Sequence, residues 1–437
     1  MATLDILHGL TQDDFNAETL GENKFANPLN LPDAYMMSIG KRVLFQNIIV
    51  DEKKIEGKEL FSFERPGPFR KIFFDPTKIN VGIVTCGGLC PGLNNVIRSI
   101  TYDCLDGYKV KNVYGFKNGF EGLTSEYSQE ALRLSADMVN SIHEQGGTIL
   151  GTSRGAQTEV DMVDTLVKFN ISILFVIGGD GTHHGSQKIA EEIKRRNLKI
   201  SIIGIPKTID NDILFIHKTF GFDTAVEEAR KAISAAHVEA KGARNGIGLV
   251  KLMGRHSGFI ALHATLASGS VNVCLIPEEE DFSLENLFER IEKRFTKSDH
   301  LVVVVAEGVG QDFLNKSIEK KYDASGNIVL QDIGIFLKKE ISKHLESKKF
   351  PHTIKYIDPS YMIRSTSANA IDSSFCLRLG TYAVHAGMAG RTNVLIGYWN
   401  QHYCLVPIPL ALRQRKQVNI NGAEWRSVLE ITVPKQK

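Results

Sequence analysis

The sequence predicts an α/β protein whose central element is a parallel β-sheet of the doubly wound type. Three short apolar runs, rich in β-branched residues, are each followed by a polar loop: Asn80–Thr85, Ile173–Ile177 and Ile200–Ile205. Such runs are typical of strands buried on both faces of a parallel sheet. The segment from Phe175 to Asp212 also holds a helix-length stretch between two of them, which is the size of one βαβ unit.

Length and composition set the bounds for this interpretation. A chain of 437 residues has room for two or three domains. Its net charge of +2, from 52 basic and 50 acidic residues, gives no overall attraction to nucleic acid or membranes, so any anion site must be local. Six cysteines without CxxC pairs, the absence of an apolar run of about 18 residues, and a start that lacks a secretory pattern predict a cytoplasmic protein.

The N-terminal segment, 1–78, is polar and irregular, with five prolines and the charged stretch DEKKIEGKE at 51–59. We expect it to form an N-terminal extension that packs on the main body or on a neighbouring subunit. No chemistry is assigned to it.

The first glycine turn, Gly87-Gly88, follows the strand Asn80–Thr85. Pro91 is expected near the first turn of the next helix, where its missing N–H costs nothing. A glycine-rich turn between a strand and a helix can hold phosphate, although it can equally be a plain connection. Arg154, which stands among glycines at Gly151–Gly155, can reach charge that develops on a transferred phosphoryl group. An isolated loop arginine is more often a solvated surface residue.

The second glycine turn is Gly178–Thr182, GGDGT, before a predicted helix. Glycines let a polyphosphate approach bare amides, and the helix N-terminus attracts anions. Asp180 offers a hard oxygen ligand suited to Mg2+. Two glycines alone would indicate only a tight turn, but an acid between them favours a site that contains a cation.

The loop PKTIDND at Pro206–Asp212 follows the next strand. It offers a lysine, a hydroxyl and two carboxylates. If the loop is extended, Asp210 and Asp212 share one side of it, and one of them can accept a hydroxyl proton while the other orients it. Taken alone, DND is also a common turn composition.

A long helix capped by Asp223 or Thr224 is expected to run to about Ala240. A strand at Gly246–Leu252 follows it and leads into Met253–Arg255.

Farther along, the strand Leu301–Val305 is followed by Glu307, and Asp323–Gly326 is expected to be an exposed turn. The segment Lys355–Arg364 then brings two cations and an aromatic residue together. The planar guanidinium of Arg364 suits a phosphate group.

Four of these motifs together resemble the 6-phosphofructokinases: GGLCPGLNNVIR at 87–98, GGDGT at 178–182, PKTIDND at 206–212 and KLMGRHSGFIA at 251–261. Their order and spacing match from about Ile79 to about Gln414. The resemblance implies the phosphofructokinase fold, with two Rossmann-like α/β/α domains and an N-terminal extension. The implied ranges are 1–78 for the extension, 79–221 with about 363–413 for a nucleotide domain, 222–362 for a fructose 6-phosphate domain, and 414–437 for a C-terminal extension.

The resemblance also implies the site residues. In the catalytic group, Asp210 is the base, with Thr208, Asp212 and Arg154. The nucleotide group is Gly88, Arg154, Gly155, Gly179, Asp180, Gly181 and Thr182, with Asp180 holding Mg2+. The sugar-phosphate group is Thr208, Ile209, Asp210, Met253, Gly254, Arg255, Glu307, Lys355, Tyr361, Met362, Ile363 and Arg364.

Two positions bear on the phosphoryl donor. Pyrophosphate-using relatives carry Asp where this chain has Gly181, and that side chain would occupy the space of the nucleotide α-phosphate. Lys207, in contrast, is the residue that those relatives carry. We give Gly181 more weight, because a lysine can pair with phosphate of either donor, and so predict ATP.

The predicted function is therefore that of an ATP-dependent 6-phosphofructokinase of glycolysis, which forms fructose 1,6-bisphosphate and is allosteric and homotetrameric or dimeric by resemblance. A pyrophosphate-dependent enzyme and a non-catalytic sugar-phosphate-binding subunit remain the alternatives. A kinase for NAD or lipid would not explain all four motifs together. No nucleic-acid or membrane partner is expected.

Overall fold

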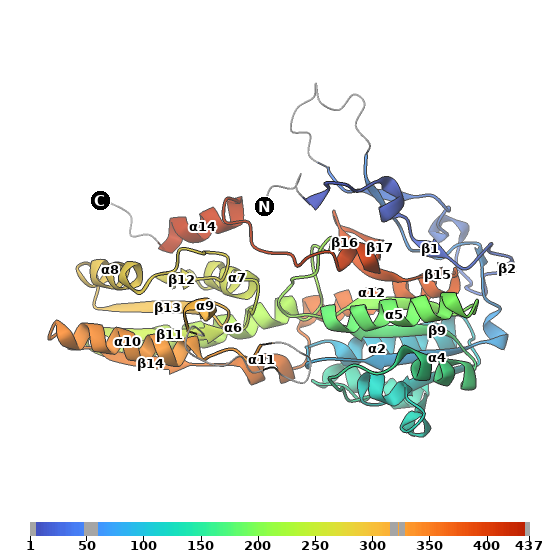
Figure 1. The fold of residues 1–437 in the computed structure, drawn as a ribbon, viewed down its shortest axis with the longest axis horizontal. Helices are drawn as coiled ribbons and strands as arrows, with labels where there is room; N and C mark the ends of the chain where they lie inside the picture. Colours follow the sequence, from blue (N-terminus) through green and yellow to red (C-terminus); the bar gives the residue numbers. More distant parts are fainter. Residues whose placement is uncertain (1–5, 48–59, 315–321, 323–327, 433–437) are drawn as a thin grey trace. The chain divides into compact units, whose positions relative to one another are not determined.

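The computed structural model describes residues 6–47, 60–314, 322 and 328–432, which form two compact units. The first unit contains the chain up to 208 with 213–221 and 365–414, and the second contains 209–212, 222–364 and the chain from 415 on (Figure 1). The sequence-based division between domains was drawn at 221/222 and 362/363. The charged stretch 51–59 and the expected turn Asp323–Gly326 lie outside the described residues.

The main sheet of the first unit combines parallel inner strands with antiparallel edges. Among the described residues its order is β3 (Arg42–Leu44), β4 (Ser62–Glu64), β17 (His402–Pro407), β16 (Val394–Trp399), β10 (Ser201–Pro206), β9 (Ile171–Gly178), β6 (Asn80–Thr85), β7 (Asn112–Phe116) and β8 (Leu132–Leu134). Strands β16, β10, β9, β6 and β7 are parallel to one another. Two small antiparallel pairs accompany the sheet, β1 (Glu18–Thr19) with β15 (Arg391–Thr392) and β2 (Phe25–Ala26) with β5 (Lys71–Ile72).

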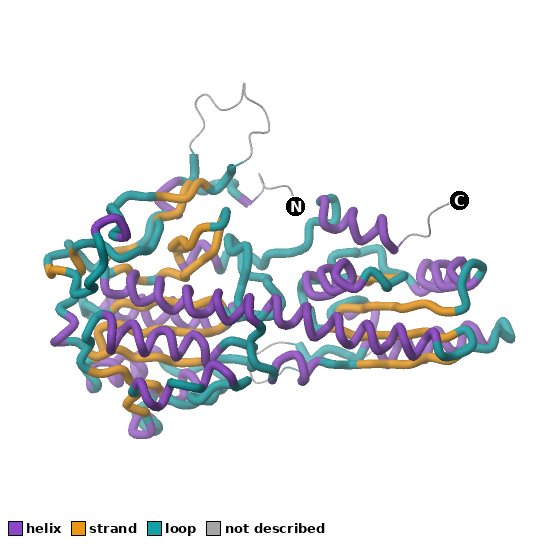
Figure 2. The backbone as a smooth tube through the Cα atoms, turned by 180° about the vertical axis from the view of Figure 1, so that it is seen from behind, coloured by secondary structure: helices purple, strands orange, loops and turns teal. Residues whose placement is uncertain are grey.

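Helices cover both faces of this sheet (Figure 2). Leu174 and Val176 of β9 belong to a core shared with α4 (Glu159–Lys168) and α5 (Asp180–Arg195). The alternate residues Ile173 and Phe175 pack against α12 (Ala370–Met388), which in turn packs on α2 (Leu93–Tyr102). Short helical segments complete the unit: η1 (Gln12–Phe15), η2 (Asp33–Tyr35), η4 (Pro76–Lys78), η5 (Asp103–Gly107), η6 (Gly119–Leu123), η7 (Ser128–Glu130), α3 (Ala136–Val139), η8 (Ile142–Glu144) and α13 (Ile408–Ala411).

The carboxyl ends of three neighbouring strands meet at one edge of the sheet. Thr85 of β6 lies opposite Ile177 of β9, and Gly178 of β9 lies opposite Pro206 of β10. Strand β7 flanks β6 on one side, whereas β9 and β10 follow on the other, so the order changes direction beside β6. In doubly wound sheets, ligands bind at such a switch point. All three motif loops of the first half of the chain leave this edge.

The second unit is built on a four-stranded parallel sheet within the described residues, in the order β12 (Val273–Leu275), β13 (His300–Ala306), β11 (Gly246–Leu252) and β14 (Thr353–Ile357). Helix α6 (Phe222–Lys241) packs on one face, where Gly248 lies against Ala236. Helix α10 (Ile333–Ser347) packs on the other, where Gly334 lies against Tyr356. The remaining helices are α7 (Phe259–Ser268), α8 (Leu284–Phe295), α9 (Gln311–Leu314), α11 (Ser360–Ser365) and α14 (Ala423–Thr432).

The predicted strands are confirmed to within a few residues, and one predicted helix cap is wrong. Helix α6 begins at Phe222, so Asp223 and Thr224 lie in its first turn and do not cap it. Helix α2 begins at Leu93, after Gly92, so Pro91 precedes the helix. Gly92 has a φ of +103°, and a Cβ there would come within 2.6 Å of the Cys376 sulfur. Only glycine fits this turn.

Candidate active site

The GGDGT motif of the first unit forms the N-terminus of α5. The helix begins at Asp180 with Gly179 as its N-cap, so the acid occupies the first helical position. Amides in the first turn of a helix have no partner within the helix and attract anions. Gly181 is exposed, and a Cβ on it would meet no atom within 4 Å. Thr182 is buried beneath the turn, against Gly178. A phosphate chain can therefore approach this turn closely.

Two cations lie at the neighbouring loop after β6. The ammonium of Lys207 donates a hydrogen bond to the carbonyl oxygen of Gly88 at 2.7 Å. The Nη2 atom of Arg154 lies 3.6 Å from the position that a Cβ on Gly88 would occupy, and the adjacent Gly155 has open space around it. The structure thus brings Gly88, Arg154 and Lys207 together. Because β6 and β9 are adjacent, the GGDGT turn lies beside them.

Asp180 supplies one carboxylate for a cation, and its Oδ2 atom lies 4.0 Å from Nε2 of His184 in the next turn of α5. Among the described residues, no group of three histidine, cysteine, aspartate or glutamate side chains could form a metal centre. A single carboxylate fits Mg2+ that takes its other ligands from phosphate oxygens and water. Asp180 therefore suits a metal delivered with a polyphosphate.

The acidic loop Ile209–Asp212 belongs to the second unit and forms a turn. Asn211 has a φ of +53°, in the left-handed region, so the loop is not extended at this residue and simple alternation does not place the two acids. The carbonyl oxygen of Asp210 accepts a hydrogen bond from the Ser257 hydroxyl at 3.2 Å. The carboxylate of Asp212, 8% exposed, lies 3.2 Å from Nη1 of Arg415. Ile209 is buried. Thr208, the preceding residue in the first unit, accepts a hydrogen bond on its carbonyl oxygen from Thr219.

The electrostatics of the second unit single out Asp210. Burial, with the carboxylates of Asp212 and Glu307, raises the pKa of Asp210 to about 7, while Arg364 and Arg415 act in the opposite direction. Burial also raises the pKa of Glu307, against the effect of Arg364 and Arg255. A carboxyl group with a pKa near neutrality suits a general base.

Residues after β11 and β13 meet at one edge of the second sheet, since Leu252 lies opposite Ala306. Gly254 has a φ of +130°, and a Cβ on it would approach the Ser257 carbonyl oxygen to 2.4 Å. Met253 is buried, and Nη1 of Arg255 donates to the carbonyl oxygen of Ile328 at 2.9 Å. Glu307 follows β13 directly.

The predicted sugar-phosphate-binding residues on helix α11 differ in their exposure to solvent. Arg364 lies in its last turn and interacts with both Asp210 and Glu307. Ile363 is fully buried, so its side chain belongs to the core, whereas Tyr361 and Met362 are exposed.

Lys355 is not brought into this group. It lies in the middle of β14, opposite Gly248, and its ammonium is 3.5 Å from Glu239 of α6. Its predicted contact with the substrate stays a prediction.

Known proteins resemble the chain over most of its length. A family model described as Phosphofructokinase matches residues 80–387. The chain belongs to the phosphofructokinase family. The match includes both glycine turns, the acidic loop and Glu307.

Curated relatives extend the family match to nearly the whole chain. The ATP-dependent 6-phosphofructokinase of Borreliella burgdorferi is 46% identical, over 96% of each chain. That of Trypanoplasma borreli is 51% identical, over 84% of this chain and 75% of its own. Among solved structures, the pyrophosphate-dependent phosphofructokinase of Marinobacter aquaeolei has a TM-score of 0.67 at 20% identity and covers 82% of this chain and 92% of its own. At that identity the likeness confirms the fold alone.

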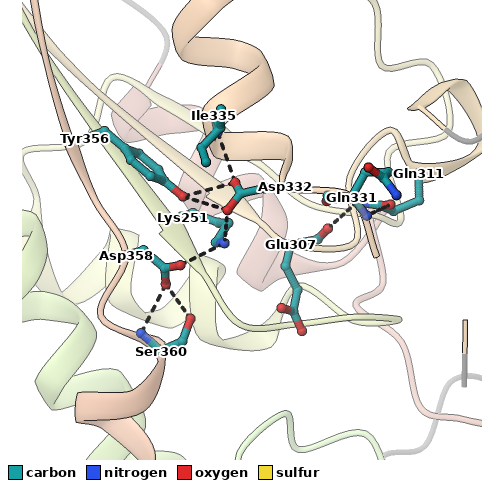
Figure 3. Close-up of polar contacts among 9 residues, drawn as sticks. All are labelled: Lys251, Glu307, Gln311, Gln331, Asp332, Ile335, Tyr356, Asp358 and Ser360. Atoms are coloured by element: carbon teal, nitrogen blue, oxygen red, sulfur yellow. Dashed lines mark hydrogen bonds and ion pairs between the residues drawn. The ribbon is translucent and has the colours of Figure 1, made fainter. Parts of the chain in front are cut away.

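This member of the phosphofructokinase family contains a partly buried charge cluster that motif reasoning missed (Figure 3). The ammonium of Lys251, on β11, lies 2.7 Å from Oδ2 of Asp332 and 2.8 Å from Oδ2 of Asp358. Asp332 caps α10, and Asp358 accepts hydrogen bonds from the amide and hydroxyl of Ser360 at the start of α11. Lys251 therefore fixes the helix that carries Arg364.

Beside the cluster, Gln311 holds Glu307 in place. Its Nε2 atom donates to the carbonyl oxygens of Glu307 and Gln331 at 2.8 and 2.9 Å. Its Oε1 atom accepts from the amide of Gln331 at 3.0 Å (Figure 3). Gln331 precedes Asp332, so the backbone at Glu307 is tied to the same cluster. Lys251, in the motif KLMGRHSG, is the one member of this cluster that the sequence motifs contain. Its partners Asp332 and Asp358 lie much farther along the chain, outside the four motifs, so the sequence did not indicate that the three residues meet.

Among the described residues, no helix has both the length and the apolar character needed to span a bilayer.

Proposed function

We propose that the chain is an ATP-dependent 6-phosphofructokinase, which transfers the γ-phosphoryl group of Mg-ATP to the 1-hydroxyl of D-fructose 6-phosphate and releases fructose 1,6-bisphosphate and ADP. Curated relatives of that name at 46% and 51% identity support it. The observation that carries the proposal is Asp210, a buried carboxyl group with a pKa raised to about 7, beside Glu307 and Arg364. That environment suits a base that accepts an alcohol proton.

The other residues divide the remaining work. Arg364 and Arg255 bind the 6-phosphate, and Glu307 accepts hydrogen bonds from the sugar hydroxyls. The first-turn amides of α5 and the guanidinium of Arg154 balance charge on the transferred phosphoryl group. Mg2+ bound with ATP neutralises phosphate charge, and Asp180 is the residue that would hold it. In-line transfer then needs no covalent intermediate on the protein.

ATP is favoured over pyrophosphate because the space beside Gly181 is open. Lys207 favours the alternative, a pyrophosphate-dependent enzyme. Its ammonium, however, donates to the carbonyl oxygen of Gly88, so a structural bond accounts for its presence.

A coupled assay for fructose 1,6-bisphosphate tests the proposal. The purified chain is incubated with fructose 6-phosphate, Mg2+ and either ATP or pyrophosphate. We expect turnover with ATP, at least tenfold above that with pyrophosphate. Turnover with pyrophosphate alone would reverse the donor assignment. Binding of fructose 6-phosphate without turnover of either donor would favour the non-catalytic subunit.

Location and assembly are proposed from the family resemblance. We propose a cytoplasmic glycolytic enzyme that forms a homotetramer or dimer. Analytical ultracentrifugation would distinguish these from a monomer.

A substitution of Lys251 tests whether its ion pairs with Asp332 and Asp358 hold helix α11 in place. Lys251→Met leaves the carboxylates of Asp332 and Asp358 without the cation between them, so we expect the start of α11 and Arg364 to move. The KM for fructose 6-phosphate should rise roughly tenfold, with a smaller change in the KM for ATP. The free energy of unfolding should fall by about 1–3 kcal/mol, a value reduced for the exposure of both carboxylates.

Steady-state kinetics and urea unfolding measure these effects. Lys339→Met, at an exposed position on α10, is the matched control and should change neither. Equal increases in both KM values would argue against an anchor specific to the sugar side.

A further inference from the structure

The segment Arg415–Val418, here called the C-terminal strap, holds two loops of the second unit. At one end, Arg415 pairs with the carboxylate of Asp212 at 3.2 Å, and the amide of Lys416 donates to the carbonyl oxygen of Asp212 at 2.9 Å. One residue of the acidic loop is thus held through both its side chain and its backbone. No motif of the family match includes the strap, because the matched residues end at 387.

The other end of the strap reaches the loop that follows β11. The amides of Val418 and Gly258 both donate to Oε1 of Glu278, at 2.8 and 3.0 Å. In between, the ammonium of Lys416 lies 5.0 Å from the centre of the Phe259 ring, within the range of a cation–π contact. The strap therefore joins the acidic loop to the loop that continues from Met253–Arg255.

We propose that the C-terminal strap is part of the fructose 6-phosphate side of the active site, and that Arg415 is a positioning residue that holds the acidic loop and balances the charge of Asp212 beside Asp210. This rests on the proposed function. The site then includes a segment that lies about 200 residues after the acidic loop in the sequence.

Backbone conformation explains why the loop needs to be held. Asn211, between the two acids, has a φ of +53°. A residue other than glycine in this region costs about 1 kcal/mol or more, and persists where its surroundings determine it. Contacts to Asp212 from the strap and to the Asp210 carbonyl from Ser257 flank this residue. Loss of Arg415 should therefore loosen the loop.

The charges around Asp210 explain why a cationic side chain is needed at position 415. Asp210 is faced by Asp212 on its own loop, Glu307 after β13, Arg364 on α11 and Arg415 on the strap, and Lys416 acts on Asp212. The two carboxylates raise the pKa of Asp210 and the two guanidiniums lower it. Removing the Arg415 charge therefore raises the pKa of Asp210 further and leaves a smaller fraction of it ionised at pH 7.

The test compares Arg415→Gln and Arg415→Lys with Arg426→Gln. The control Arg426 is exposed on α14 and pairs only loosely, at 3.7 Å, with Glu430. For Arg415→Gln we expect the acid limb of kcat/KM for fructose 6-phosphate to move up by about one pH unit. At pH 7 the loss is then roughly 3–10-fold, and much of it is recovered at pH 9. Arg415→Lys keeps the charge and should restore the limb, and Arg426→Gln should match the parent chain.

Hydrogen–deuterium exchange of the free protein supplies a readout that does not depend on activity. We expect faster exchange at 209–212 in Arg415→Gln and unchanged exchange there in Arg426→Gln. If the parent chain lacks phosphofructokinase activity but the loop loosens, the proposed function fails and the holding role stands. An active parent with an unshifted pH limb and unchanged exchange in Arg415→Gln would overturn the inference. So would an equal loss of activity at every pH, since that would indicate a structural defect alone.

Discussion

Asp210→Asn is expected to lower kcat by roughly 100-fold or more, because the variant keeps the shape of the side chain but cannot accept a proton. The KM for fructose 6-phosphate should change little, since Arg364, Arg255 and Glu307 remain. Steady-state kinetics with saturating ATP measure both quantities. A turnover near that of the parent chain would remove Asp210 from the role of base.

The pH dependence gives the same prediction a second readout. A general base works in its ionised form, and the pKa of Asp210 is raised to about 7. The parent activity should therefore rise with pH between about 6 and 8 and level off above. In Asp210→Asn this limb should be absent from the residual activity.

As the pH rises, the contribution of Asp210 to the stability of the fold should fall while the activity increases. The pKa of Asp210 is higher in the folded protein than its ordinary value of 3.8, so folding favours the protonated form. Its contribution to stability is therefore full below about pH 4 and is lost as the pH rises to about 7. At pH 8, Asp210→Asn should have a Tm equal to or above that of the parent chain. A large fall in Tm would show that the variant lost activity through misfolding.

Gly181→Asp is expected to lower kcat/KM for ATP by roughly 100-fold, because it places a second negative charge in the open space beside the first turn of α5. The fold should survive, since an acid in the first turn of a helix is favourable. Activity with pyrophosphate, measured in the same preparation, should fall far less or increase.

Gly181→Ala separates charge from bulk. A Cβ at this position meets nothing within 4 Å, so the alanine variant should stay within about threefold of the parent chain. Unchanged ATP kinetics in Gly181→Asp would overturn the donor argument.

The sequence predicted the features that depend on neighbouring residues alone, namely the strands and the loops that follow them. The strands Asn80–Thr85 and Gly246–Leu252 have the expected bounds, because an apolar run with β-branched residues has few other stable states in a parallel sheet. The motif loops then lie at the carboxyl edges of those strands, which follows from the parallel arrangement. Glu307, directly after a strand, was predictable on the same ground.

Contacts between residues far apart in the sequence could not be predicted from local patterns. Arg415 meets Asp212 although the two are far apart in the sequence, and nothing in the local composition of the strap marks it. The left-handed backbone at Asn211 depends on partners that hold the loop, so alternation along an extended loop could not place the two acids. The register of Lys355 on β14 brings its ammonium to 3.5 Å from Glu239, so its contact with the substrate stays a prediction.

The interleaved composition of the first unit also constrains the order in which the chain matures on the ribosome. Strand β10 is complete at residue 206, but its neighbour β16 begins only at Val394. Until that later segment emerges from the ribosome, the edge of β10 in the nascent chain exposes a row of unpaired amides and carbonyls, and such an edge is prone to pairing with other chains. A polypeptide truncated before residue 394 would leave this edge permanently open.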